Sequence, residues 1–116
     1  MLRKYHRLSK KEFSRVFKKG VSFSFEDFHI RYAASPQGSS RFGVSCGLKI
    51  SKKAVQRNRI RRRLYEIIRA NLAQIPKGDY CIIVKPSILS KDFSSLERSL
   101  TDSLKNIHER HSRRAH

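Results

Sequence analysis

Apolar residues near the start of the chain recur three and four positions apart across residues 10–19. This is the spacing of one helix face, so we predict a helix there. Ser9 and Glu12 form a capping-box pattern at its first turn, in which each residue satisfies the other's backbone amide. Gly20 follows the helix, and we expect it to end the helix in the left-handed conformation.

Alternation of apolar and polar residues predicts three strands after this helix. Apolar side chains occupy alternate positions in residues 21–25, 28–32 and 42–46, the period of a half-buried strand. Residues 35–40 (SPQGSS) have turn chemistry and separate the second strand from the third. We therefore expect a hairpin across this turn.

The second half of the chain predicts a long helix, a strand and a last helix. Apolar residues form one stripe at helical spacing over residues 55–75. Residues 79–85 contain the continuous apolar run YCIIV, which suits a central strand covered on both faces. Helical spacing then runs from Phe93 to Ile107, and we expect residues 110–116 to fray.

The resulting order α-β-β-β-α-β-α predicts an α+β fold, a two-layer sandwich with a four-stranded sheet. Residues 1–116 have the size of one compact domain, so we expect a single domain. Residues 1–6 contain no apolar run long enough for a signal peptide, and no stretch approaches the roughly 20 apolar residues that cross a bilayer. We expect no membrane association and a cytoplasmic protein.

The composition adds a strong positive charge to this picture. The chain has 27 Lys and Arg against nine Asp and Glu, a formal net charge of +18. Solubility requires far less, so we expect an anionic partner, with nucleic acid the leading candidate. Cys46 and Cys81 lie inside apolar strand segments and are expected to be buried, reduced thiols, not disulfide or metal ligands.

The positive charge is concentrated in one stretch of sequence. No acidic residue lies between Asp27 and Glu66, and seven of the cations there fall within residues 52–63. The plain interpretation of such a run is a solvated basic face. However, Glu66 alone is placed to pair with any of these charges, so they repel one another in the free chain. Anion binding therefore explains them better. The cations of this stretch are Arg31, Arg41, Lys49, Lys52, Lys53, Arg57, Arg59, Arg61, Arg62 and Arg63.

The position of these cations on the long helix also points to anions. They surround its first turns, where the helix dipole is positive and cations cost stability. Phosphates offset this cost, because free helix amides and arginine side chains both bind anions. The helical period turns Asn58, Arg59, Arg62 and Arg69 away from the apolar stripe and leans Arg57 toward the sheet.

Three aromatic residues form a second candidate group. Phe13 and Phe17 lie four residues apart on the first helix, and Tyr32 ends the second strand. Aromatic residues at such spacing are more often core residues in a small domain. Exposed rings beside a basic groove would instead stack unpaired bases. The residues alone leave both interpretations open.

Metal-dependent catalysis by the protein itself is not indicated. His108 and His111 lie three residues apart near the end of the chain, without the spacing of a zinc-protease helix and without an evident third ligand. The acids are scattered apart from Glu26 and Asp27, so no paired carboxylates are placed to hold Mg²⁺ for phosphodiester cleavage. We therefore predict no catalytic residue and no metal site in the protein.

Several of these segments together resemble the bacterial ribonuclease P protein component. The resemblance rests on residues 54–62 (AVQRNRIRR), which open the long helix after an FGVS strand. Residues 7–20 (RLSKKEFSRVFKKG) resemble that family's first helix, and residues 79–84 (DYCIIV) its last strand. Roughly residues 3–107 match in the expected order. The loop at residues 47–53 departs from the family pattern by one extra residue.

The resemblance implies a left-handed β-α-β crossover around the arginine helix, in a fold like domain 2 of ribosomal protein S5. It also implies a protein subunit, about one per catalytic RNA, of a complex that hydrolytically removes the 5′ leader of precursor tRNA. The RNA is then the catalyst and its Mg²⁺ ions the cofactor. Two further departures are Ser51, where the family commonly has glycine, and Tyr65, where it frequently has a basic residue.

The resemblance also implies which residues contact RNA. Phe13, Phe17 and Tyr32 would line the cleft that receives the leader. Charge alone adds Lys52 and Lys53 to the surface for the catalytic RNA. The matched positions on that surface are Arg57, Asn58, Arg59, Arg61 and Arg62.

Two other classes of protein share this charge and size. A ribosomal or other structural RNA-binding protein predicts that Phe13, Phe17 and Tyr32 are wholly buried. A ribonuclease P protein predicts that they share an open groove edged by Arg57 and Asn58. A DNA-binding architectural protein, the third class, would bind duplex DNA as tightly as structured RNA at equal salt.

Overall fold

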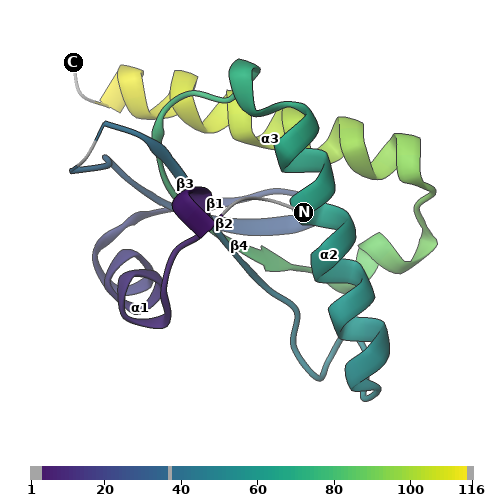
Figure 1. The fold of residues 1–116 in the computed structure, drawn as a ribbon. Coiled ribbons are helices and arrows are strands. Elements are labelled where there is room, and N and C mark those ends of the chain that lie inside the picture. The colour runs from purple at the N-terminus through teal and green to yellow at the C-terminus, as the bar shows by residue number, and fades with distance from the viewer. Residues whose placement is uncertain (1–3, 37, 115–116) are drawn as a thin grey trace.

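The structure is a computed structural model that describes residues 4–36 and 38–114, and it confirms the predicted order of helices and strands (Figure 1). The helices and strands are α1 (Lys10–Lys19), β1 (Val21–Ser24), β2 (Phe28–Ala33), β3 (Ser40–Ser45), α2 (Ala54–Ala70), β4 (Gly78–Val84) and α3 (Phe93–Arg114). Three short 3₁₀ turns are η1 (Lys4–His6), η2 (Leu72–Gln74) and η3 (Pro86–Ser90).

The four strands form one mixed sheet in the order β1-β2-β4-β3. β2 pairs antiparallel with both β1 and β4, whereas β3 pairs parallel with β4. The predicted hairpin between β2 and β3 is therefore wrong, because β4 lies between them. The continuous apolar run of β4 suits this central place, and α2 carries the chain across to it as the helix of a β-α-β unit.

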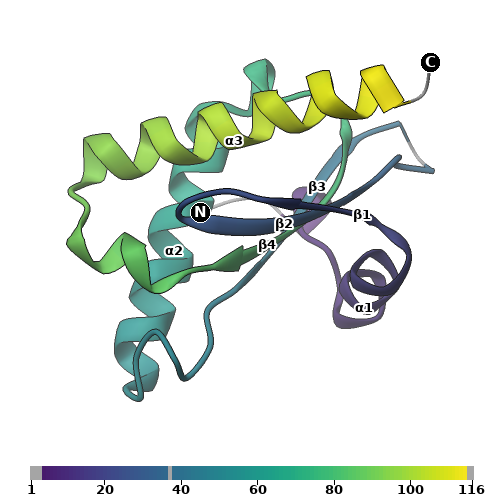
Figure 2. The same cartoon turned by 180° about the vertical axis from the view of Figure 1, so that it is seen from behind.

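Helices cover both faces of the sheet, α2 and α3 on one and α1 on the other (Figures 1 and 2). Phe28 and Ile30 of β2 and Ile82 of β4 face the core under α2 and α3. The intervening Cys81 points to the opposite face, where its thiol donates to the Phe13 carbonyl oxygen at 3.3 Å. Both cysteines are free and buried, as predicted.

Two helices end at different places from those predicted. The amide side chain of Asn71 donates to the Ile67 carbonyl oxygen at 2.8 Å and ends α2 at Ala70. The last residues of the predicted stripe therefore lie in and after η2, although Ile75 stays buried in the core. α3 continues to Arg114, so residues 110–114 are helical where the sequence suggested a frayed tail; residues 115–116 lie outside the described residues.

The capping box at the start of α1 is confirmed, with Ser9 and Glu12 each bonded to the other's backbone amide. Gly20 ends the helix differently from the prediction: its φ is −73°, which is extended and not left-handed. Glycine is needed there for space, because a Cβ atom would lie 2.6 Å from the Val16 oxygen and 2.9 Å from the Tyr32 oxygen. Among the described residues, no helix combines the length and apolarity needed to span a membrane.

Candidate nucleic-acid interface

The N-terminus of α2 has the properties of an anion-binding site. The helix begins after Lys53, which makes no side-chain capping bond, and its first turn contains no acidic residue. Lys52 and Lys53 are both exposed beside this turn. The positive end of the helix dipole is thus surrounded by cations without a carboxylate to offset it, and such an arrangement favours a bound anion.

The arginines of α2 divide between two sides of the helix. Arg57 is half-buried and donates to the Ser51 carbonyl oxygen at 3.0 Å, in the loop between β3 and α2. Arg61 lies one turn further on the same side and donates to Asn58. Both lie near Cys46: burial raises the pKa of this thiol, while the charges of Arg61 and Arg57 act in the opposite direction.

The other arginines face solvent or the opposite side of α2. Arg59 and Arg63 border a hollow against η3 and α3, while Arg62 is exposed. None of the three pairs with an acidic residue of the described chain. Glu66 pairs with Arg69 at 3.3 Å, which lies outside the basic stretch with which the sequence suggested it would pair. The predicted exposure of Asn58, Arg59, Arg62 and Arg69 is confirmed.

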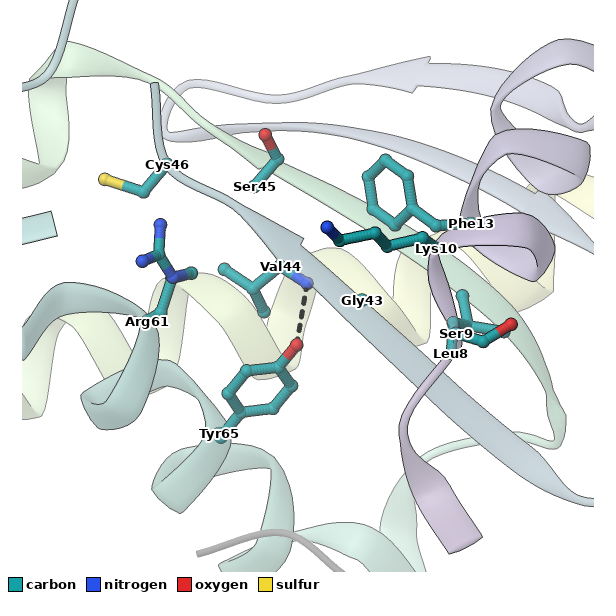
Figure 3. A pocket seen from close by; sticks show the side chains of 10 residues that line it. All are labelled: Leu8, Ser9, Lys10, Phe13, Gly43, Val44, Ser45, Cys46, Arg61 and Tyr65. Atoms are coloured by element: carbon teal, nitrogen blue, oxygen red, sulfur yellow. Dashed lines mark hydrogen bonds between the residues drawn. The ribbon is translucent and has the colours of Figure 1, made fainter. Parts of the chain in front are cut away.

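A groove of about 380 Å³ crosses β3 between α1 and α2, and we call it the α1–α2 groove (Figure 3). Lys10 and Phe13 reach it from α1, and Arg61 and Tyr65 from α2. The Tyr65 hydroxyl accepts the backbone N–H of Val44 at 3.1 Å and so satisfies one amide on the open edge of β3. The residues lining the groove are Leu8, Ser9, Lys10, Phe13, Gly43, Val44, Ser45, Cys46, Arg61 and Tyr65.

Aromatic and cationic side chains continue along the α1 side of the sheet. The Phe13 and Phe17 rings are nearly parallel, at 14°, with their centroids 6.5 Å apart. The Arg31 guanidinium lies 4.7 Å from the centre of the Phe17 ring and donates to the Phe17 carbonyl oxygen at 2.6 Å. Phe17 remains 41% exposed, so this cluster offers a partly exposed ring and a cation to a ligand.

Tyr32 does not join Phe13 and Phe17, and its predicted place in the same cleft is wrong. It is only 6% exposed, lies 5.1 Å from the Tyr80 ring centre, and donates to the Lys77 carbonyl oxygen at 3.2 Å. Its side chain belongs to the core under α2 and α3. Successive strand residues face opposite sides of a sheet, so its neighbour Arg31 takes the α1 side.

Arg41 is likewise not part of the basic surface, although it falls within the basic stretch of sequence. Its side chain is 7% exposed and bonds Asp79 through two nitrogens, at 2.8 and 3.0 Å. It also pairs with Glu12, and Arg15 reaches Asp79 at 3.0 Å. This buried network joins α1 to the sheet and positions the α1 wall of the groove.

Three residues of this interface are not among the predicted RNA contacts. Lys10, Arg31 and Tyr65 face the groove or its aromatic extension, although of the three only Arg31 belongs to the basic stretch of sequence. Alternation along β2 carried the signal for Arg31, since Phe28, Ile30 and Tyr32 share one face and Arg31 must take the other. Only the folded chain brings Lys10 and Tyr65 together across β3.

The described residues can hold anions and stack rings, but they supply no metal-binding cluster. Within them, no group of three or more His, Cys, Asp or Glu side chains could hold a metal ion. The two buried acids already have cationic partners: Asp27 contacts Lys91 at 3.2 Å, and Asp79 contacts Arg41. This surface therefore offers a partner cationic and aromatic side chains.

The fold and this surface define a class: small basic α+β proteins suited to a polyanionic partner. The family model described as Ribonuclease P matches residues 1–108 of the chain. A ribonuclease P protein component from Nitratiruptor sp. is 34% identical over 102 residues, which cover 88% of this chain and 91% of that protein. One from Listeria monocytogenes is 35% identical over 109 residues, covering 90% and 89%.

Solved structures agree with these relatives. The ribonuclease P protein of Thermotoga maritima superposes with a TM-score of 0.79 at 31% identity, covering 86% of this chain and 96% of that one. A mutant of the Staphylococcus aureus protein superposes with a TM-score of 0.80 at 25% identity, covering 91% and 90%. The chain belongs to the ribonuclease P protein family, the protein components of that ribonucleoprotein.

Proposed function

We propose that this chain binds both a catalytic ribonuclease P RNA and the 5′ leader of precursor tRNA, and so promotes endonucleolytic removal of the leader to give mature tRNA 5′ ends. About one protein serves each catalytic RNA. The RNA, with its Mg²⁺ ions, is the catalyst, and the protein alone does not cleave. The observation that carries this proposal is an uncapped, basic helix N-terminus beside an open aromatic groove.

We assign the catalytic RNA to the exposed first half of α2. Asn58, Arg59 and Arg62 face solvent there, and neither arginine has an acidic partner among the described residues. Phosphates can bind these unpaired guanidinium groups without the free-energy cost of first breaking an ion pair within the protein. Lys52, Lys53, Arg57 and Arg61 extend this surface around the helix start toward the groove.

We assign the leader to the α1–α2 groove and the aromatic cluster beside it. Phe13 lines the groove, Phe17 is exposed, and Lys10 and Arg61 stand on opposite walls. A single strand needs contacts of this kind, rings for its bases and cations for its phosphates, without readout of base edges. The groove differs from the expected one, because Arg61 edges it in place of Arg57 and Asn58, and Phe13 alone of the three predicted aromatic residues lines it. Phe17 is nevertheless exposed beside it, and this supports the leader-binding role over a purely structural RNA-binding one, which predicts that all three are wholly buried.

Two finer assignments follow from the same role. We assign the Mg²⁺ ions to the RNA; the two buried acids of the described chain, Asp27 and Asp79, already pair with cations. We also assign the protein to the cytoplasm, where the catalytic RNA and the tRNA precursors are made.

The test is cleavage of precursor tRNA by a bacterial ribonuclease P RNA at low Mg²⁺, with and without the purified chain. We expect the chain to stimulate cleavage, because its cations offset the repulsion between two RNA molecules. Replacing Arg59 and Arg62 together by alanine should remove most of this stimulation. The matched control replaces Arg98 and Lys105, two exposed cations of α3, by alanine and should keep it.

Three outcomes would contradict the proposal. Tight RNA binding without stimulation would indicate a structural RNA-binding protein. Equal affinity for duplex DNA and structured RNA at the same salt would indicate an architectural nucleic-acid-binding protein. Cleavage by the chain without RNA would contradict the assignment of catalysis to the RNA.

A further inference from the structure

The side of α2 opposite the groove carries a second, smaller concavity, which we call the α2–η3 hollow. It measures about 230 Å³ and lies between α2, η3 and the start of α3. Figures 1 and 2 place these three elements side by side at one end of the molecule. We propose that this hollow binds one unpaired nucleotide of the catalytic RNA, its base on the apolar floor and its phosphate between two arginines.

The floor of the hollow is apolar. Ile60 of α2, Ile88 of η3 and Leu96 of α3 line it, and the last two are buried in the core. Leu89 stands at its rim with 52% of its surface exposed. A ligand that covered Leu89 and filled the hollow would remove apolar surface from water, which is favourable.

The rim of the hollow is cationic. Arg59 and Arg63, one turn apart on α2, both line it, and neither bonds to another described residue. Lys91 also lines it, but it pairs with Asp27 at 3.2 Å and with Glu26 at 3.8 Å. The charge available to a ligand therefore comes mainly from the two arginines, whose planar groups can bind a phosphate and stack on a base.

An unpaired nucleotide fits this combination better than a paired RNA helix does. The backbone of a paired helix presents phosphates alone and would leave both the apolar floor and Leu89 in water. A nucleotide outside a helix presents its base face and its phosphate together. The hollow also adjoins the exposed arginines that we assign to the catalytic RNA, so RNA already lies beside it. This inference therefore rests on the proposed function, and it adds that the catalytic RNA places an unpaired nucleotide against α2.

The test compares Leu89→Ala with Leu48→Ala, which removes the same exposed side chain from the basic loop before α2, outside the hollow. Affinity of the full chain for a bacterial ribonuclease P RNA is measured across a salt series, and the RNA is probed chemically in each complex. We expect Leu89→Ala to weaken binding about fivefold, because alanine covers less of the apolar face of the base. Its salt slope should not change, because no charge is removed. One unpaired nucleotide that the unmodified chain protects should become reactive again.

Leu48→Ala should leave that nucleotide protected. The inference is overturned if the two variants bind equally and protect the same nucleotides, or if the protected nucleotides all lie in paired helices. It is also overturned if Leu89→Ala changes only the sedimentation of the free chain, since the hollow would then be a contact between copies of the protein. If the unmodified chain itself fails to bind the RNA or to stimulate cleavage, the proposed function fails instead.

Discussion

At the scale of single residues, the groove depends on the absence of a side chain at Gly43. This residue lies in the edge strand β3, directly under the Phe13 ring and close to Leu8. A methyl group there would overlap the ring, although the backbone of Gly43 is not in a left-handed conformation. Space, and not backbone freedom, therefore requires glycine at this position.

We predict that Gly43→Ala lowers the free energy of unfolding by about 1–3 kcal/mol, because Phe13 or the whole of α1 must shift to admit the methyl group. Urea or thermal unfolding measures the change. Gly47→Ala is the matched control, since a Cβ atom there would meet nothing within 4 Å. Equal stability of the Gly43 variant and the unmodified chain would mean that Phe13 does not rest on β3 as described.

At the scale of elements, α1 is held to the sheet by a buried charge network as well as by apolar packing. Arg41 of β3 binds Asp79 of β4 and Glu12 of α1, and Asp79 also receives Arg15 of α1. The Glu12 carboxylate serves the capping box at the same time, and the Ser9 amide, more than Arg41, holds the pKa of Glu12 below its ordinary value. The start of α1 and its attachment to the sheet therefore share one side chain.

We predict that Arg41→Met destabilises the fold by about 3–5 kcal/mol, because it leaves a charged Asp79 without its buried partner. Arg15→Met removes the second cationic partner of Asp79. Because the Arg15 side chain is 39% exposed, this substitution should lower the free energy of unfolding by less than about 1 kcal/mol. Chemical unfolding compares the two, and amide exchange should show α1 opening first in the Arg41 variant. Similar destabilisation by both substitutions would contradict a special role for the buried pair.

At the scale of the whole molecule, a net charge of +18 attracts any polyanion. The charge is unevenly distributed, however, and two parts of the surface differ in how many acidic residues accompany the cations. The first half of α2 presents cations without acidic partners, whereas the Asp27 region has Glu26, Asp27 and Asp102 around Lys91 and Arg98. Specific RNA binding should therefore depend on where a charge is removed as well as on how many are removed.

The salt dependence of RNA binding tests whether the position of a charge matters, by comparing two variants that have the same net charge. The slope of log affinity against log salt should become less steep by about 1.4–1.8 when Arg59 and Arg62 are replaced by alanine, about 0.7–0.9 for each phosphate that is no longer neutralised. The Arg98→Ala, Lys105→Ala variant has the same net charge and should keep a slope close to that of the unmodified chain. Equal reductions in both would mean that total charge, not the α2 surface, governs binding.

Local sequence patterns predicted the type of nearly every element and the location of the charge. The capping box of α1, the alternation in β2 and the apolar run of β4 each depend on neighbours a few residues away, so they can be recognised without knowing the fold. The exposure of Asn58, Arg59 and Arg62 follows in the same way from the helical period of α2.

Tertiary structure alone decided which segments meet. Placing β4 between β2 and β3 depends on contacts between segments far apart in sequence, which no local pattern contains. The same packing buries Arg41 against Asp79. The alternation of β2 already puts Tyr32 and Arg31 on opposite faces, but only packing decides that Tyr32 faces the core and Arg31 faces α1. It also gives the two sides of α2 different neighbours, so that Arg61 lines a groove and Arg59 a hollow. The sequence by itself determined the elements and their charge; packing between distant segments determined the two concave surfaces.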